Sequence, residues 1–176
     1  GFTHTWSLAS GFLWATIPPN ISNSSDLTRS AGTLRGMTHR IGYGEDAHQL
    51  EAGRPLWIGG LEIVDSPHGA VAHSDGDALL HCLSDALLSS VSSGDIGMHF
   101  SDTDSQWKGV SSEHILKHCL NRVLEQGYTP VNLAAVVTLD RPKLGPLRDA
   151  LTLRVAELLK MRVEDVGLTF KTSEGL

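Results

Sequence analysis

The sequence has few cysteines, few positive charges and no long apolar run, and each shortage excludes a class of protein. Its two cysteines, Cys82 and Cys119, both lie in segments with a helical apolar period, so we expect small buried side chains and no disulfide scaffold or catalytic thiol. The sequence has 14 lysines and arginines and 20 acidic residues, and the resulting charge of −6 argues against nucleic acid as a partner. No apolar run approaches the roughly 20 residues of a membrane span.

The composition is otherwise that of a globular protein, with 40% hydrophobic residues and room in 176 positions for one domain with a proper core. Residues 1–36 differ, because they carry little charge and gather Ser, Thr, Asn and Pro between Ile17 and Ser30. We interpret them as an N-terminal extension, non-native or disordered, with Met37 as the true start. A transit peptide and a short aromatic interaction segment around Phe12 and Trp14 are the alternatives, and we leave this region out of the fold prediction.

Residues that could bind a metal ion or phosphate are most concentrated between His73 and His81. These nine residues contain two histidines and two aspartates and lead directly into an apolar helix. Ser74 or Asp75 is a natural N-cap, because a short side-chain oxygen can accept a free N–H of the first turn. His81 then lies inside the helix, and His73 lies just before its start, where an anion is favoured. The stretch therefore predicts phosphate and metal chemistry.

A second candidate pair follows a strand that begins near His39. The side chains of Asp46 and His48 should point to the same side of an extended backbone, where they could share one ion, although a surface loop explains most such pairs. Asp77 and Asp85 lie four residues before and after His81 and share its helix face. Each is either an orienting partner of that imidazole or a solvated side chain.

Apolar periods predict the remaining elements. They are a strand ending at Gly44, a β-hairpin over 54–64, the helix that carries His81, a loop over 93–104, a helix from Ser111 or Ser112, a strand over 131–139, a helix from Pro146 and a strand over 168–171. This order predicts an α+β fold, a single-domain sandwich whose sheet has helices on one face.

From about Arg40 to Leu176, the chain resembles the 2-C-methyl-D-erythritol 2,4-cyclodiphosphate synthases, enzymes of the non-mevalonate isoprenoid pathway. The resemblance rests on the order and spacing of Asp46-Ala47-His48, His73-Ser74-Asp75-Gly76-Asp77, His81, Gly94-Asp95-Ile96-Gly97, Asp102-Thr103-Asp104, Lys108-Gly109, Pro142-Lys143 and Thr172-Ser173-Glu174. It implies a homotrimer with active sites between subunits. It also implies a phosphorus–oxygen lyase that converts 4-diphosphocytidyl-2-C-methyl-D-erythritol 2-phosphate to the cyclic diphosphate and releases CMP.

The resemblance also assigns metal and catalytic roles. Asp46, His48 and His81 match the ligands of a zinc ion, and Glu174 matches the ligand of a second divalent cation, Mg²⁺ or Mn²⁺. His73 and Thr172 match the positions that stabilise charge on the transferred phosphoryl group. Two imidazoles and one carboxylate would leave the fourth zinc position open, as a catalytic site requires.

Substrate contacts follow from the same match. The methylerythritol part is expected at Asp95, Ile96, Gly97, Phe100, Ser101, Asp102, Thr103 and Asp104. Further contacts are expected from Asp46, Ala47, His48, His73, Ser74, Lys171, Thr172, Ser173 and Glu174. The cytidine part is expected at Leu139, Asp140, Arg141, Pro142, Lys143, Leu144 and Gly145, contributed by the adjacent subunit.

The sequence departs from the family at its end. The family continues past Leu176 with a glycine-rich turn, a phosphate-binding arginine and a closing strand, so we interpret residues 37–176 as a synthase domain that is C-terminally incomplete. A non-catalytic trimeric remnant that binds metal or an isoprenoid phosphate is therefore the alternative, and a generic zinc phosphohydrolase is a third hypothesis. We expect a bacterial cytoplasmic location, or the plastid stroma if residues 1–36 are a transit peptide.

Overall fold

The protein is described by a computed structural model that covers residues 6–16, 39–101 and 109–174. Seven strands are described: β1 (Trp6–Thr16), β2 (His39–Ala52), β3 (Trp57–Ile58), β4 (Leu61–Glu62), β5 (His68–Ala70), β6 (Thr129–Thr138) and β7 (Val166–Lys171). The α-helices are α1 (Ala78–Ser90), α2 (Ile96–His99), α3 (Ser112–Glu125) and α4 (Arg148–Leu159), and two 3₁₀ turns cover Gly145–Leu147 and Val163–Asp165. None of the described helices is long and apolar enough to cross a membrane.

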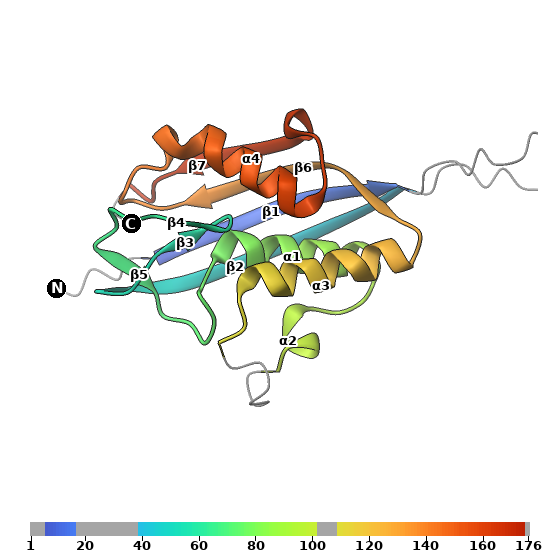
Figure 1. Ribbon diagram of the computed structural model, residues 1–176, viewed down its shortest axis with the longest axis horizontal. Helices are drawn as coiled ribbons and strands as arrows, with labels where there is room; N and C mark the ends of the chain where they lie inside the picture. The colour runs from blue at the N-terminus through green and yellow to red at the C-terminus, as the bar shows by residue number, and fades with distance from the viewer. Residues whose placement is uncertain (1–5, 17–38, 102–108, 175–176) are drawn as a thin grey trace, which may run out of the picture.

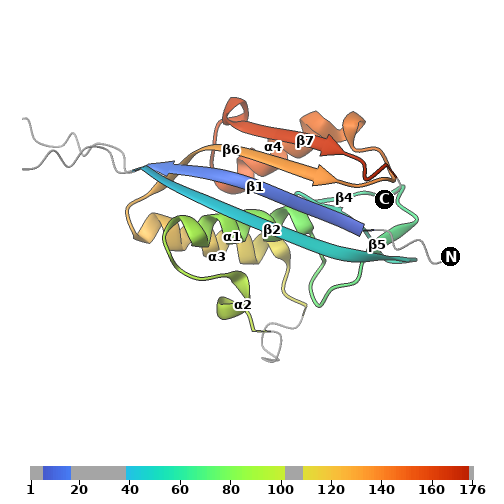
Figure 2. The same ribbon diagram turned by 180° about the vertical axis from the view of Figure 1, so that it is seen from behind.

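Five strands form one sheet in the order β5-β2-β1-β6-β7, and β3 and β4 form a separate hairpin. Strand β1 is antiparallel to both neighbours, whereas β6 and β7 are parallel. Helices α1, α3 and α4 cover one face of the sheet (Figure 1), and the opposite face carries no helix among the described residues (Figure 2). The predicted single mixed α/β domain with helices on one face is therefore confirmed.

The main difference from the sequence-based prediction is β1, which comes from the extension that we left out of the fold. Part of that extension, Trp6–Thr16, lies at the centre of the sheet and pairs with β2 along its whole length. Ala9, Leu13 and Ala15 are fully buried. Because most residues on this buried face are small, the apolar alternation is weak in the sequence, and the partner strands on both sides decide the structure. The expectation of disorder is wrong for these residues.

Helix α1 packs unusually close to β2 because two glycines of β2 face it. A Cβ atom added at Gly42 would lie 1.8 Å from the carbonyl oxygen of Ala86, and one at Gly44 would lie 2.0 Å from that of Cys82. The Cys82 thiol donates to the carbonyl oxygen of Gly44 at 3.3 Å. Burial raises the pKa of this thiol to about 12, which fits the predicted inert, buried cysteine.

We expect Gly44→Ala to destabilise the fold by about 3 kcal/mol, because the added methyl group meets helix backbone that cannot rotate away. Thermal and urea unfolding measure the loss. Gly167→Ala is the matched control, since its methyl group would lie at an ordinary 3.4 Å from the carbonyl oxygen of Leu133. Equal stability of the two variants would show that the close approach of α1 to β2 is unimportant.

Candidate functional site

Asp46, His48 and His81 converge at one point, although His81 lies more than thirty residues from the other two. Strand β2 turns its even-numbered side chains toward the helices, so Asp46 and His48 both face α1. His81 lies in the first turn of α1. The Asp46 Oδ2 atom lies 2.9 Å from His48 Nε2 and 3.0 Å from His81 Nδ1, and the two ring nitrogens are 3.2 Å apart.

The three donor atoms fit a small divalent metal ion. Tetrahedral zinc held at about 2.1 Å by each ligand separates neighbouring ligand atoms by about 3.4 Å, slightly more than the distances here. All three donors come from side chains that are half-buried or buried, and among the described residues no other group of three such side chains converges in this way. A small outward movement of each donor would make room for the ion.

The electrostatics of the triad favour a cation. Burial alone would raise the pKa of Asp46, but the hydrogen bonds and charges of His48 and His81 hold it well below its ordinary value. Burial would also lower the pKa of His81, yet the hydrogen bond and negative charge of Asp46 outweigh this effect and raise it. The carboxylate is therefore ionised, and the triad holds either a proton or a metal ion.

A second set of contacts orients the His81 ring. On the side away from Asp46, His81 Nε2 lies 2.9 Å from Ser112 Oγ and 3.3 Å from Ser74 Oγ. The Ser112 hydroxyl donates to the carboxylate of Asp75, which also accepts the Ser112 backbone N–H. Because the Ser112 proton points to Asp75, its oxygen accepts from His81 Nε2–H. This leaves the lone pair of Nδ1 directed at the triad, as metal-binding histidines require.

Two other acidic residues have roles that differ from those we predicted. Asp77, not Ser74 or Asp75, is the N-cap of α1; its carboxylate is buried and accepts the backbone N–H groups of Leu80, Gly59 and Gly60. Asp85 accepts the backbone N–H of Ile96. Neither carboxylate is hydrogen-bonded to the His81 ring, so the acidic orienting partner is Asp75, acting through Ser112. The sequence indicates Ser112 only as a possible helix cap, and no spacing in it points to the orienting role.

Other predicted residues lie just before α1 or in and around α2. His73 is exposed just before Ser74. Asp95 is the N-cap of α2 and accepts the backbone N–H of Met98 at 2.9 Å, which fixes the predicted methylerythritol stretch Asp95, Ile96 and Gly97. Phe100 is buried. Asp102, Thr103 and Asp104 lie outside the described residues.

Seven of the residues predicted for the cytidine and phosphate parts line one cavity of about 340 Å³, whereas Asp140, Arg141, Pro142 and Ser173 do not. It is lined by Leu139, Lys143, Leu144, Gly145, Arg148, Phe170, Lys171, Thr172 and Glu174. Asp140 does not line it but accepts the backbone N–H and hydroxyl of Ser173, which lower the pKa of its carboxyl and tie the two segments together. Thr172 donates to Glu174 at 2.7 Å.

Two residues of this cavity, Arg148 and Phe170, were missed in the sequence. The Arg148 guanidinium lies 4.8 Å from the centre of the Phe170 ring and donates to the carbonyl oxygen of Leu168. In the sequence, the position of Arg148 shortly after Leu139–Gly145 is the one feature that could have indicated its place in this cavity. Together with Lys143 and Lys171 it gives the cavity a positive charge that suits phosphate.

The cavity and the triad lie at the same end of the sheet. The pairing register places Asp46 opposite Ala9, Ala9 opposite Val137, and Val137 beside Phe170. These residues form one row across four strands, from β2 to β7. With about 4.8 Å between strands, the row spans about 14 Å.

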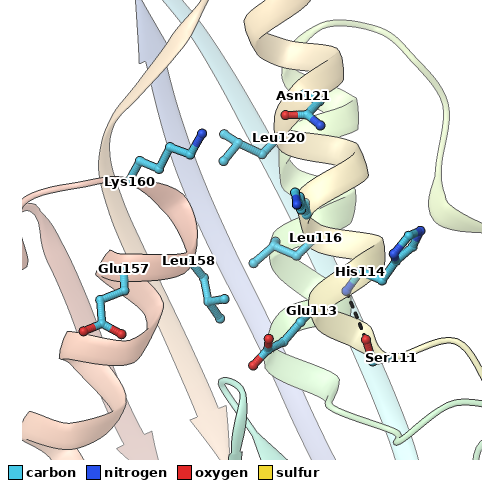
Figure 3. Close-up of a pocket in the computed structure, with 10 residues that line it drawn as sticks. Ser111, Glu113, His114, Leu116, Leu120, Asn121, Glu157, Leu158 and Lys160 are labelled. Atoms are coloured by element: carbon cyan, nitrogen blue, oxygen red, sulfur yellow. Dashed lines mark hydrogen bonds between the residues drawn. The ribbon is translucent and has the colours of Figure 1, made fainter.

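A second cavity, of about 360 Å³, lies between α3 and α4 (Figure 3). Its walls include Leu116, Leu120 and Leu158, with Glu113 and Lys160 at its edges. None of the residues that we predicted for substrate or metal binding lines it. The positively charged cavity and the triad therefore form the candidate site.

Comparisons with known proteins show the family to which the chain belongs. A family model described as "YgbB family" matches residues 39–176. A 2-C-methyl-D-erythritol 2,4-cyclodiphosphate synthase of Deinococcus radiodurans is 58% identical over 143 residues, which are 81% of this chain and 89% of the relative. The enzyme of the same name from a strain of Thermus thermophilus is 56% identical over 137 residues, covering 78% of this chain and 90% of the relative.

A solved structure supports the same relationship. It is described as "Structure of 2C-Methyl-D-erythritol-2,4-cyclodiphosphate Synthase (bound form CDP)" and matches with a TM-score of 0.74 and 53% identity. The comparison covers 77% of this chain and 89% of that structure. The similarity thus extends over most of both proteins.

We expect Ser112→Ala to weaken zinc binding about 10–100-fold, because His81 loses the acceptor that fixes its ring and its tautomer. Competition with a chelating dye measures the affinity. Ser111→Ala is the neighbouring control: it removes the N-cap of α3, which should lower stability by about 1 kcal/mol but leave zinc affinity unchanged. Equal zinc affinities in the two variants would contradict the orienting role of Ser112.

Proposed function

The chain belongs to the YgbB family and functions as a 2-C-methyl-D-erythritol 2,4-cyclodiphosphate synthase, and on this basis we propose which of its residues perform the reaction. The observation that supports the assignment most strongly is the convergence of Asp46, His48 and His81. The reaction implied by this function closes a ring between two phosphates of 4-diphosphocytidyl-2-C-methyl-D-erythritol 2-phosphate. It belongs to isoprenoid precursor biosynthesis and releases CMP, which makes the enzyme a phosphorus–oxygen lyase.

We propose that Asp46, His48 and His81 hold a zinc ion. When bound there, the ion supplies a Lewis acid that polarises a diphosphate oxygen. The chain contributes the fixed geometry: Gly42 and Gly44 set the distance between β2 and α1, and Asp75 with Ser112 holds the His81 ring. Water is not the nucleophile in this reaction, so accurate placement of the two phosphates contributes most of the catalysis.

The bond changes follow from the substrate. An oxygen of the 2-phosphate attacks the β-phosphorus, the bond from that phosphorus to the bridging oxygen breaks, and CMP leaves with the electron pair. We propose that His73 and Thr172 donate hydrogen bonds to the phosphoryl oxygens as charge moves between them. Asp95, Ile96 and Gly97 would bind the methylerythritol hydroxyls through backbone and carboxylate groups.

We propose that the cavity beside β7 binds the cytidine diphosphate. Lys143, Lys171 and Arg148 supply positive charge, and Leu139 and Leu144 supply an apolar wall. The solved structure at 53% identity is described as a bound form with CDP, which supports cytidine diphosphate as the kind of ligand. Glu174 would hold a second divalent ion, Mg²⁺ or Mn²⁺, together with the phosphates, since one carboxylate alone binds such ions weakly.

We also propose a homotrimer in which the cavity of one subunit faces the triad of the next. The open face of the sheet supports this assembly, because it exposes the apolar side chains of Ile41, Tyr43, Val131 and Val136. An apolar patch of this kind on a sheet face usually marks a protein interface. The bacterial sources of the most similar relatives favour the predicted bacterial location over a plastid one.

The first test is CMP release from the named substrate. We expect His81→Ala to lower the rate by at least about 100-fold, because the charge held at the triad acts on the reacting phosphate. The control is His68→Ala, which changes a histidine on β5 away from the triad and should leave the rate unchanged. A chain that binds zinc and CDP but never forms CMP would instead be the non-catalytic remnant.

Arg148 provides the second test. We expect Arg148→Ala to weaken CDP binding about tenfold, the usual effect of losing one charged hydrogen bond, and to raise KM more than it lowers kcat. Arg148→Lys should recover part of the affinity, because it restores the charge without the planar fork. Arg122→Ala, which removes an exposed arginine of α3, is the control. Unchanged CDP affinity in Arg148→Ala would exclude Arg148 from the nucleotide site.

A further inference from the structure

A second pair of histidines lies outside the proposed active site. His99 ends α2, and His118 lies in the middle of α3. The Nδ1 atom of His99 and the Nε2 atom of His118 are 3.4 Å apart, and both rings are half-buried and open to solvent on one side. Neither residue is among those proposed above to bind the substrate or the metal ions.

The geometry of this pair closely matches that of the two histidines in the triad. The ring centroids of His99 and His118 are 5.3 Å apart, the same distance as those of His48 and His81. Their facing nitrogens are 3.4 Å apart, against 3.2 Å in the triad. A tetrahedral ion at about 2.1 Å from each nitrogen needs about 3.4 Å between the two nitrogens.

His99 is already held in the tautomer that a metal requires. Its Nε2–H donates to the carbonyl oxygen of Ser93 at 2.9 Å, so the lone pair of Nδ1 points at His118. A backbone carbonyl on the far nitrogen is the usual orienting partner of a metal-binding imidazole. In the metal-free protein, His118 Nε2–H donates to His99 Nδ1. Binding of an ion requires that proton to move to His118 Nδ1, with no change in net charge.

The surroundings of His118 favour its neutral form and hold its ring in place. Burial lowers the pKa of His118, and electrostatic interactions with the neighbouring His99, Arg122 and His114 lower it further against the opposite effect of Glu125. Phe100 packs edge-on against His118, with ring centroids 5.0 Å apart. A neutral imidazole is the form that binds metal.

One neighbouring histidine helps to define the site. His114 lies one turn before His118 on α3 and contacts the Phe100 ring at 6.5 Å between centroids. It projects from the side of α3 away from α4 (Figure 3). It is not among the proposed ligands, because its nitrogens do not lie close enough to both other rings to form a group of three.

We propose that His99 and His118 form a second metal site, which binds a transition-metal ion such as Zn²⁺ and ties α2 to α3. Water completes the coordination, so this site is weaker than the three-ligand triad. Because α2 begins with the proposed substrate residues Ile96 and Gly97, an ion here would restrain the methylerythritol loop from outside the active site. The proposal does not depend on the assignment of the triad.

The experiment counts zinc ions by equilibrium dialysis of the full chain, without nucleotide, so that no phosphate can recruit an ion to Glu174. We expect two zinc ions per chain in the unchanged protein and one in His118→Ala. His68→Ala is the control and should retain two. His81→Ala should also retain one, bound more weakly, which tests the triad separately from the new site.

A second measurement covers the case in which His118→Ala folds poorly. In the His81→Ala background, zinc should raise Tm progressively with its concentration by binding at the second site, and His99→Gln should abolish that increase. One zinc ion in the unchanged protein, or the same zinc count with and without His118, would overturn the proposal. So would a zinc-dependent rise in Tm that survives His99→Gln in the His81→Ala background.

Discussion

The close approach of α1 to β2 is the constraint on which the rest of the site depends. Gly42 and Gly44 have no side chains that would keep the helix away from the strand. Asp46 and His48 lie on the same face of β2, two and four positions after Gly44. His81, in the first turn of α1, then meets both within hydrogen-bonding distance. The distances between the three donor atoms are thus a consequence of how closely the backbones of α1 and β2 pack.

Three aspartates hold the loops around this contact, each by binding backbone N–H groups or a hydroxyl. Asp77 joins the start of α1 to the Gly59-Gly60 turn, Asp85 fixes the start of α2, and Asp75 joins the loop before α1 to the start of α3 through Ser112. Buried carboxylates are costly unless such donors satisfy them. The aspartates of the stretch from His73 to His81 are used in this structural way. His81 is therefore the one residue of that stretch that belongs to the triad.

Much of this arrangement could be predicted from sequence, and the failures have identifiable causes. The period of β2 predicted that Asp46 and His48 would share a side, because that property is local to one strand. The role of Ser112 could not be predicted, since it arises where the ends of two helices meet. Strand β1 was missed because Ala9 and Ala15 give little hydrophobic signal, and its position between β2 and β6 follows from long-range pairing that no local pattern encodes.

The position of β1 also determines how the two halves of the site are related. Because β1 lies between β2 and β6, it separates the triad from the nucleotide cavity while keeping Asp46 and Phe170 in one row across the sheet. Removing one strand from that row would bring the two halves closer by about 4.8 Å and change the pairing partner of β2. Within one chain the two halves therefore stay about 14 Å apart. In the proposed trimer each half faces its counterpart on a neighbouring subunit, so the sheet topology determines where each half lies on the chain and the assembly determines which halves share a substrate.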